Sequence, residues 1–287
     1  MGTAQAITQV AEIMKASKNP SVAVVSATSG TTDTLIKLGR TALAGDAWEE
    51  VLEQLIAKHQ TILKELELTL SLNEYFEEIT NLLKGIHLIR ELSPSTMDRL
   101  MGFGERMSSQ ILAALFIKQG KKAQAIDAYT IIFTDNNFNE GNVNFEKTDQ
   151  VVKATITPLL EQGIIPVVTG FVAQAENGHY ITLGRGGSDY TGAIVAAALD
   201  AKELEIWTDV DGIYQADPRF IPAAHLLEKL SFNEASELAY FGAKVLHPKT
   251  IKPAINKNIP VKILNTFNTA AKGTLITNEE NEELMDL

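Results

Sequence analysis

The sequence of this 287-residue chain predicts an α/β fold built around a mainly parallel sheet, because two kinds of apolar segment alternate along it. Short apolar runs, each long enough for one buried strand, alternate with longer stretches whose apolar residues recur at helical spacing. Such alternation favours parallel pairing, because each helix carries the chain back across the sheet. The composition, with 45% hydrophobic and 21% charged residues, is that of a globular domain and excludes collagen-like and disordered classes.

The first elements form a βα unit. A helix is expected to begin after Thr3, which can cap it, and to end before Pro20. The apolar run 22–26 predicts a buried parallel strand, and a polar turn and a second apolar helix follow it. Ligands collect at the carboxyl ends of such strands, so this turn is a first place to look for a site.

A helical insertion interrupts the sheet from about residue 47 to residue 119. Apolar residues repeat through it at helical spacing, and Ser93 and Pro94 divide it. We expect Gly102 and Gly104 to interrupt it a second time.

Strands and helices then alternate to the end of the pattern. Helices are expected at about 147–162, 189–199, 233–242 and 248–256. Strands are expected at 125–129, 131–134, 164–169, 180–183, 204–208, 261–264 and 274–276.

Charge and cysteine content exclude several classes of protein. The chain has 25 basic and 36 acidic residues, a net charge of −11, which argues against nucleic acid as the main partner. It has no cysteine, which excludes disulfides and cysteine metal sites, and its five histidines show no paired metal spacing and are expected in surface or capping roles. No apolar run reaches the roughly 18 residues of a membrane span. We therefore expect a cytoplasmic protein with no metal site of its own and no membrane partner.

The sharpest motif lies between an expected strand and an expected helix, at residues 182–191, with the sequence TLGRGGSDYT. Three glycines let several backbone N–H groups face an anion at the start of the helix, with Arg185 and Asp189 beside it. The alternative is a glycine-rich turn in which Ser188 or Asp189 caps the helix. Neither a Walker A loop nor a G-x-G-x-x-G motif is present, so the usual P-loop and Rossmann signals are lacking.

Two further segments combine polar groups with turn residues. Residues 207–214, WTDVDGIY, followed by 217–219, DPR, place acidic and hydroxyl groups after a strand, where they could contact a nucleotide and its metal. Residues 241–248, FGAKVLHP, include Lys244, which could bind a phosphate. The alternatives are an ordinary Asp-Gly turn and a solvated lysine.

Together these segments resemble the catalytic domain of the aspartokinases, in the amino acid kinase superfamily, over nearly the whole chain. The resemblance implies a three-layer αβα sandwich with a mainly parallel central sheet and a helical insertion. It also implies an aspartate-binding N-terminal lobe at 1–165 and an ATP-binding C-terminal lobe at 166–277. The matching segments, in order, are 26–32 (SATSGTT), 103–106 (FGER), 184–191, 207–217, 241–248 and 262–266 (KILNT).

The implied reaction is phosphoryl transfer from ATP, with Mg²⁺ bridging the phosphates, to the side-chain carboxylate of L-aspartate. Its product, 4-phospho-L-aspartate, begins lysine, threonine and methionine biosynthesis. Among the substrate contacts, Glu105 resembles the group that pairs with the ammonium, Arg185 the fork on a carboxylate, and Ser26 and Thr32 the small polar contacts. Asp189 resembles the carboxylate that orients catalytic groups, together with Arg185. The nucleotide-binding residues implied are Gly186, Gly187, Thr208, Asp209, Tyr214, Asp217, Arg219 and Lys244.

Two departures from the family pattern shape the expectation for this chain. Aspartokinases begin with a strand carrying Lys-Phe-Gly-Gly-Thr-Ser, and Met1 lies where that motif would end, so we expect weak activity or none. Residues 278–287 are acidic and resemble the start of a linker, so we expect the C-terminal regulatory domains to be absent.

Alternatives remain open at this point. One is a related kinase whose acceptor is acetylglutamate, a carbamate or a nucleotide. Another is a non-catalytic fragment that binds nucleotide or is completed by another chain. A homo-oligomer is a further possible assembly.

Overall fold

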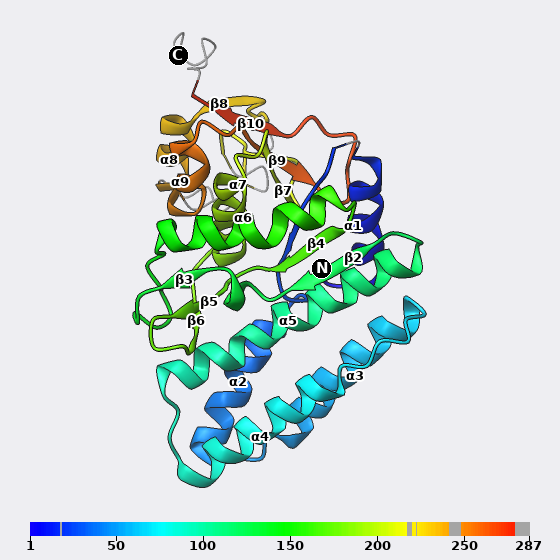
Figure 1. The fold of residues 1–287 in the computed structure, drawn as a ribbon, viewed down its shortest axis with the longest axis vertical. Coiled ribbons are helices and arrows are strands. Elements are labelled where there is room, and N and C mark those ends of the chain that lie inside the picture. Colours follow the sequence, from blue (N-terminus) through cyan, green and yellow to red (C-terminus); the bar gives the residue numbers. More distant parts are fainter. Residues whose placement is uncertain (18, 217–219, 222, 241–247, 279–287) are drawn as a thin grey trace. The chain divides into compact units, whose positions relative to one another are not determined.

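A computed structural model describes residues 1–17, 19–216, 220–221, 223–240 and 248–278 (Figure 1). The chain forms two compact units, Met1–Ser188 and Asp189–Leu287. Five of the seven described strand pairs are parallel and two are antiparallel. The predicted α/β class with predominantly parallel pairing is confirmed, and the described strands form three sheets.

The first sheet of the N-terminal unit is wholly parallel and lies between two helices. Figure 1 shows the helix α5 on one face of this sheet and α6 on the other, which gives the three layers. Parallel pairing brings the carboxyl ends of all three strands to one edge. The elements are β1 (Ala23–Val25), β4 (Ile165–Thr169) and β2 (Ala123–Ile126), in the order β1-β4-β2, with α5 (Pro94–Lys118) and α6 (Phe145–Glu161).

A second sheet of this unit holds the strand that leads into the glycine-rich loop. Its strand β5 is absent from the predicted elements. Phe171, between β4 and β5, has φ +70°, and this left-handed conformation separates two strands that the sequence does not visibly divide. The sheet has the order β3 (Phe133–Thr134), β5 (Val172–Ala175) and β6 (Tyr180–Thr182), and a 3₁₀ turn at Ala128–Thr130 precedes it.

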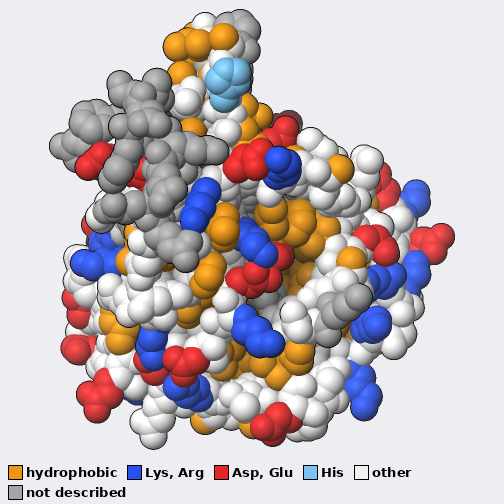
Figure 2. All heavy atoms as spheres, turned by 90° about the horizontal axis from the view of Figure 1, so that it is seen from above, with side chains coloured by type: hydrophobic (Ala, Val, Ile, Leu, Met, Phe, Trp, Pro, Cys, Tyr) orange, Lys and Arg blue, Asp and Glu red, His pale blue; other side chains and the backbone are white. Residues whose placement is uncertain are grey.

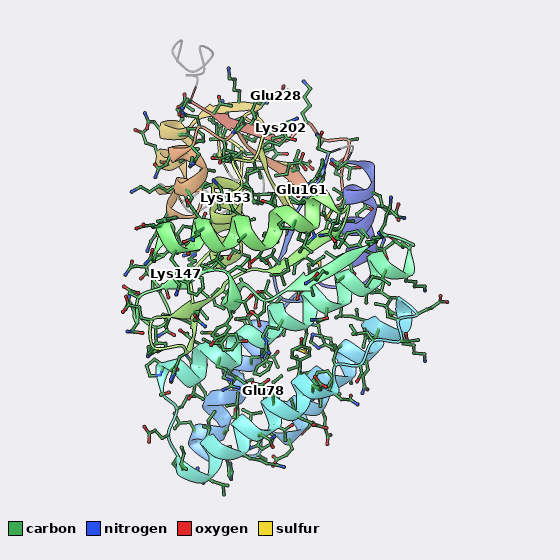
Figure 3. All side chains as sticks on the ribbon, in the orientation of Figure 1. Glu78, Lys147, Lys153, Glu161, Lys202 and Glu228 are labelled. Carbon is green, nitrogen blue, oxygen red and sulfur yellow. The ribbon has the colours of Figure 1, made fainter. Side chains whose placement is uncertain are left out.

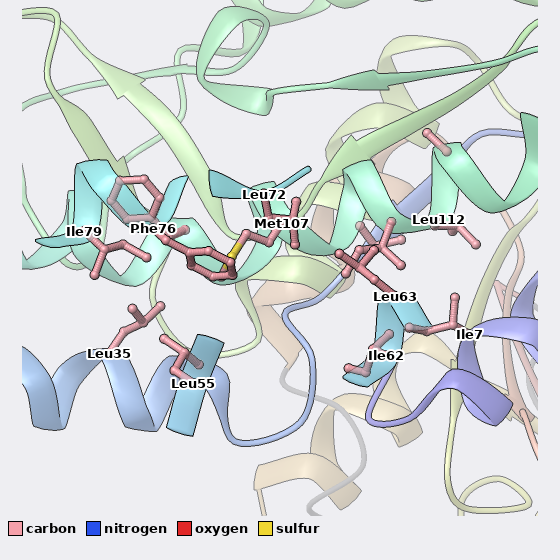
Figure 4. Close-up of a cluster of buried hydrophobic side chains, with 14 of the residues drawn as sticks. Ile7, Leu35, Leu55, Ile62, Leu63, Leu72, Phe76, Ile79, Met107 and Leu112 are labelled. Carbon is pink, nitrogen blue, oxygen red and sulfur yellow. The ribbon is translucent and has the colours of Figure 1, made fainter. Parts of the chain in front are cut away.

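The predicted helical insertion is confirmed, and its apolar faces form the main core of the unit. Thr3 caps the first helix, accepting a hydrogen bond from the Ala6 amide at 3.2 Å, and Ser93 caps α5 ahead of Pro94. Figure 4 shows the buried side chains that fill the space between the helices, with Leu35, Ile79 and Met107 fully buried among them. The other helices are α1 (Ala4–Ala16), α2 (Thr31–Ala44), α3 (Glu49–Glu65) and α4 (Asn73–Ile89).

Helix α5 runs without interruption through Gly102 and Gly104, so the expected second break is wrong. The two glycines serve packing instead. A Cβ atom at Gly102 would lie 2.7 Å from Val172 Cγ1, and one at Gly104 would lie 2.6 Å from Ala27 Cβ. The absence of these side chains lets α5 approach the strands closely.

Charge pairs join α5 to its neighbour α4. Glu78 of α4, labelled in Figure 3, accepts from Arg99 and lies 3.5 Å from Arg106, both on α5. The Arg106 guanidinium also lies 3.1 Å from the Asp127 carboxylate and 5.2 Å above the Tyr180 ring. These contacts hold the middle of α5 between α4 and β6.

The C-terminal unit has one mixed sheet. Strand β7 and helix α9 match their predicted bounds, whereas β8 is absent from the predicted elements because three residues carry too short a pattern. None of the described helices in either unit is long and apolar enough to cross a membrane. The sheet order is β7 (Leu204–Thr208), β9 (Val261–Asn265), β10 (Thr274–Thr277) and β8 (Lys229–Ser231), with α7 (Gly187–Ala198), α8 (Phe232–Tyr240) and α9 (Pro248–Asn256).

The close approach at Gly104 gives a stability prediction. Gly104→Ala forces a methyl group against Ala27 and should destabilise the chain by about 1–3 kcal/mol. Gly85 on α4 has open space around its Cβ position, so Gly85→Ala should be neutral or stabilising by about 0.5–1 kcal/mol. Urea unfolding followed by circular dichroism measures both, and equal midpoints for the two variants would contradict the packing role.

Candidate functional site

The carboxyl edge of the β1-β4-β2 sheet gathers the substrate-side residues that the sequence predicted. Strands β1 and β4 end side by side, and the Gly170 amide donates to the Val25 carbonyl at 2.8 Å. Beyond β1, the Ser26 side chain is exposed and its carbonyl accepts from Ser108 Oγ at 2.6 Å. Thr32 lies half-buried in the first turn of α2, at the end of the same loop.

Glu105 is the most unusual group at this edge. Its side chain on α5 is buried, and Oε1 accepts a hydrogen bond from the Ala27 amide at 3.1 Å. Its Oε2 atom is buried with no hydrogen-bond partner among the described residues. Burial raises the pKa of the Glu105 carboxyl group to about 8, although the Ala27 hydrogen bond acts in the opposite direction. A buried carboxyl group with one free oxygen is suited to receive a cationic group from a ligand.

Two residues of the helical insertion form hydrogen bonds with the loop 26–32. The sequence analysis assigned neither of them a role in the site. Lys58 Nζ donates to Thr31 Oγ1 at 3.1 Å, and His59 Nε2 lies 3.2 Å from Thr28 Oγ1. His59 is fully buried rather than at the surface, and its Nδ1 lies 2.8 Å from the Leu55 carbonyl. Burial lowers the pKa of His59, which favours the neutral ring. The expected surface or capping role of this histidine is therefore corrected to a buried support for the loop.

The glycine-rich loop lies at the same edge of the sheet. Gly184 and Gly186 have φ of +78° and +69°, and the Gly187 amide closes the turn on the Gly184 carbonyl at 3.0 Å. A Cβ atom at Gly187 would lie 2.6 Å from the Phe171 ring, so the loop packs closely on the turn that follows β4. These positions need glycine for conformation and for space.

Arg185 lies exposed in this loop, between the two left-handed glycines. The N-terminal unit thus contains Arg185, Gly186 and Gly187, in a loop packed on the turn after β4, as well as Ser26, Thr32 and Glu105 near the end of the neighbouring β1. Their roles stay predictions. Helix α7 begins at Gly187, before Ser188 and Asp189, so those two residues lie in its first turn and do not cap it.

Asp189 follows directly in the first turn of α7. Its carboxyl group is largely buried, and burial raises its pKa to about 6. The start of a helix favours a negative charge, but the loss of hydration dominates here. A carboxyl group with a raised pKa beside a glycine-rich turn is a candidate functional group, and its predicted orienting role stays a prediction.

Three of the predicted nucleotide contacts, Thr208, Asp209 and Tyr214, lie in the C-terminal unit, at or shortly after the carboxyl end of β7, which pairs with β9. These strands pair in parallel, with Thr208 opposite Asn265, and Thr208 Oγ1 donates to Asp209 Oδ1 at 3.2 Å. Asp211 Oδ1 accepts from Asn265 Nδ2 at 2.7 Å. Tyr214 follows this turn and forms an isolated bridge with Leu226. Asn265, within the segment 262–266, had no predicted role, yet it holds the turn that carries Asp209.

Three predicted nucleotide contacts, Asp217, Arg219 and Lys244, lie outside the described residues and stay predictions. Among the described residues, no group of three or more His, Asp or Glu side chains could hold a metal ion. Figure 2 shows basic and acidic side chains interspersed over the face that it views.

A match to a protein-family model shows which family the chain belongs to. The Amino acid kinase family matches residues 1–265. The chain belongs to the amino acid kinase family. Its glycine-rich loop and the carboxyl edge of its parallel sheet are thus features of an amino acid kinase fold.

Named relatives within this family are aspartokinases. The chain is 38% identical to aspartokinase 1 of Arabidopsis thaliana over 96% of its own length and 50% of the relative's. It is 35% identical to the lysine-sensitive aspartokinase 3 of Escherichia coli over 97% of its length and 62% of the relative's. The chain therefore spans about half to three-fifths of these relatives.

Solved structures agree with the sequence relatives. Escherichia coli aspartokinase III in complex with aspartate and ADP matches with a TM-score of 0.86 and 32% identity, over 98% of this chain and 63% of that one. The Clostridium acetobutylicum aspartate kinase matches with a TM-score of 0.79 and 27% identity, over 97% of this chain and 60% of that one. The expected amino acid kinase fold is confirmed.

Because Glu105 is buried, replacing it with neutral glutamine should increase the free energy of unfolding by an amount that depends on pH. In the unfolded chain the carboxyl group ionises near its ordinary pKa of 4.5, whereas in the folded chain it stays protonated up to about 8. The folded state therefore loses stability as pH rises from 4.5 to 8, and Glu105→Gln removes that loss. We expect the variant to be more stable than the parent by several kcal/mol above pH 8, about 5 at most, with the difference falling to a few tenths near pH 4.5.

Thermal unfolding between pH 4.5 and 8.5 measures this difference. Glu65→Gln, which removes an exposed carboxylate from α3, is the control and should show no such trend. A Glu105→Gln variant less stable than the parent at pH 8.5 would show that Glu105 is ionised and paired in the folded chain.

Proposed function

We propose that the chain catalyses phosphoryl transfer from ATP to the side-chain carboxylate of L-aspartate. The observation that carries the proposal is the buried Glu105 carboxyl group, with one oxygen free, at the edge that also holds Arg185. An amino acid offers complementary groups, because its ammonium can pair with Glu105 and its α-carboxylate with the guanidinium. The names of the similar aspartokinases, and the aspartate and ADP in one similar structure, favour aspartate as that amino acid.

Residues around these two anchors complete the substrate side. Ser26 and Thr32 offer hydroxyl groups for the substrate, and the Gly186 backbone amide would face a phosphate at the start of α7. The Gly187 amide already donates to the Gly184 carbonyl, so Gly187 would instead let the phosphate approach the backbone closely. Asp189, in the first turn of that helix, would orient the groups around the transferred phosphoryl. The lobes at 1–165 and 166–277 remain our assignment for the aspartate and ATP sides.

The proposed reaction needs positioning more than proton transfer. The side-chain carboxylate of aspartate is ionised at neutral pH, so it attacks the γ-phosphorus of ATP without a general base. A bond forms between a carboxylate oxygen and phosphorus, the bond from phosphorus to the β,γ-bridging oxygen breaks, and ADP leaves with the electron pair. Catalysis then rests on alignment and on neutralising the phosphate charge.

The nucleotide is proposed to bind beyond β7 and β9. Thr208, Asp209 and Tyr214 would contact it, with Asp217, Arg219 and Lys244 as further predicted contacts. Mg²⁺ enters as part of the MgATP substrate, where it neutralises phosphate charge when bound. The carboxylates of Asp209 and Asp211 fit the oxygen ligands that Mg²⁺ prefers, directly or through water.

Acceptor specificity tests the proposal. ADP release in a coupled assay should depend on L-aspartate and should not occur with acetylglutamate, carbamate or UMP. Succinate is the sharpest control, because it keeps both carboxylates of aspartate and lacks the amine that Glu105 would bind. Turnover of succinate equal to that of aspartate would contradict the role of Glu105, and turnover with another acceptor alone would overturn the proposed function.

Arg185→Ala extends the same assay to the carboxylate contact. Losing a charge-assisted hydrogen bond to a carboxylate should raise the KM for aspartate by roughly tenfold or more and leave the KM for ATP unchanged. Arg99→Ala removes a partly exposed arginine of α5 outside the site and serves as the control. A change confined to the KM for ATP would place Arg185 on the nucleotide.

A further inference from the structure

Asp98 is a buried carboxylate of α5 that the proposed reaction does not use. Its side chain is fully buried and accepts three hydrogen bonds. Oδ2 accepts from the Asn139 amide at 2.8 Å and the Thr182 amide at 3.1 Å, and Oδ1 accepts from Thr182 Oγ1 at 3.0 Å. Burial raises the pKa of Asp98, and the three donors counter that shift. A group buried with this many partners joins the elements that supply them.

These partners flank the loop that carries Arg185. Thr182 ends β6, two residues before Gly184. The Asn139 carbonyl packs closely against the loop, since a Cβ atom at Gly184 would lie only 3.1 Å from the carbonyl oxygen. The Gly141 amide also donates to the Thr182 carbonyl at 3.0 Å, which ties the supporting segment to β6. Asp98 thus binds both β6, which leads into the loop, and the segment around Asn139, which packs against the loop.

Asp98 and Glu105 lie on the same face of one helix. Seven residues make nearly two helical turns, so the two carboxyl groups leave α5 in similar directions, about 10 Å apart along its axis. Glu105 binds the Ala27 amide after β1, and Asp98 binds the Thr182 amide at the end of β6. A single rigid element therefore sets the distance between the loop after β1 and the loop after β6.

We propose that Asp98 is a positioning residue that fixes the loop carrying Arg185 relative to α5, the helix that carries Glu105. The inference rests on the proposed function for the assignment of Arg185 and Glu105 to the substrate. Asp98 does not touch the substrate and acts through Thr182, Asn139 and the loop between Gly184 and Gly187. Its loss should therefore weaken aspartate binding and leave ATP binding unchanged.

Three variants separate positioning from a general loss of structure. Asp98→Ala removes all three hydrogen bonds. Asp98→Asn can keep its amide oxygen on both backbone donors and turn its amide nitrogen toward Thr182 Oγ1, so it should restore most of the affinity. Ser93→Ala is the matched control, because it removes the cap of the same helix without touching the loop.

We expect Asp98→Ala to raise the KM for aspartate by about tenfold, with the KM for ATP and the Ser93→Ala values near those of the parent. The double variant with Arg185→Ala should show little further increase over Arg185→Ala alone, because both changes remove one contact. Independent, multiplying effects in the double variant would overturn the proposal. An equal rise in both KM values, or the same rise in Ser93→Ala, would also overturn it.

Hydrogen exchange tests the loop without any substrate. Asp98→Ala should speed amide exchange across 182–187 and at Asn139, while exchange within α4 stays at the parent rate. Unchanged exchange in the loop would overturn the positioning role even where aspartate phosphorylation is confirmed. If the parent chain neither turns over nor binds aspartate, the proposed function fails, and the loop measurement alone then decides whether Asp98 orders the loop.

Discussion

The removal of the Glu105 carboxyl group from water is the constraint on which the site depends. A buried carboxyl group without a charged partner stays neutral at a pH where it would ordinarily ionise, and its pKa of about 8 records that cost. One oxygen is satisfied by the Ala27 amide and the other is left for a ligand. The chain thus gives up stability at this position, which is common where a site must be ready for a charged group.

Helix α5 meets this constraint because it lies unusually close to the strands. The glycines at 102 and 104 leave room for the side chains of Val172 in β5 and Ala27 after β1, and Glu105 accepts from the Ala27 amide. The same helix carries Asp98 two turns earlier, against the end of β6. The positions of Glu105 and of the end of β6, both within the N-terminal unit, are therefore set by one continuous helix and the segments that it contacts.

Part of this arrangement could be predicted from the sequence, where local patterns decide the outcome. The cap at Thr3, the helix after Pro248 and the strand ending at Thr208 follow from residues within one or two turns of each other. The glycine-rich loop was predicted for the same reason, since its conformation depends on its own glycines. Glu105 and Arg185 were identified from motifs that resemble those of the aspartokinases; Glu105 contacts the loop after β1 and Arg185 lies in the loop after β6, and their roles stay predictions.

The other features of the fold and of the site depend on contacts between residues far apart in the sequence, which local patterns do not reveal. The pattern predicted a break at Gly102, but the close neighbour that explains this glycine is Val172, 70 residues later in the chain. Asp98 and Thr182 are 84 residues apart, and Thr28 and His59 are 31 apart. Strand β5 was missed because the left-handed turn before it falls on Phe171, a residue type that does not signal such a turn.

We infer that Glu105 is protonated in the unliganded chain and loses its proton when the ammonium group of aspartate binds beside it. Calorimetric titration of the chain with L-aspartate at pH 7, in two buffers of different ionisation enthalpy, counts the protons released on binding. Our account predicts the release of nearly one proton at pH 7 and a much smaller release at pH 9, where the free carboxyl group is already ionised. Binding of aspartate at pH 7 with no proton released would contradict it.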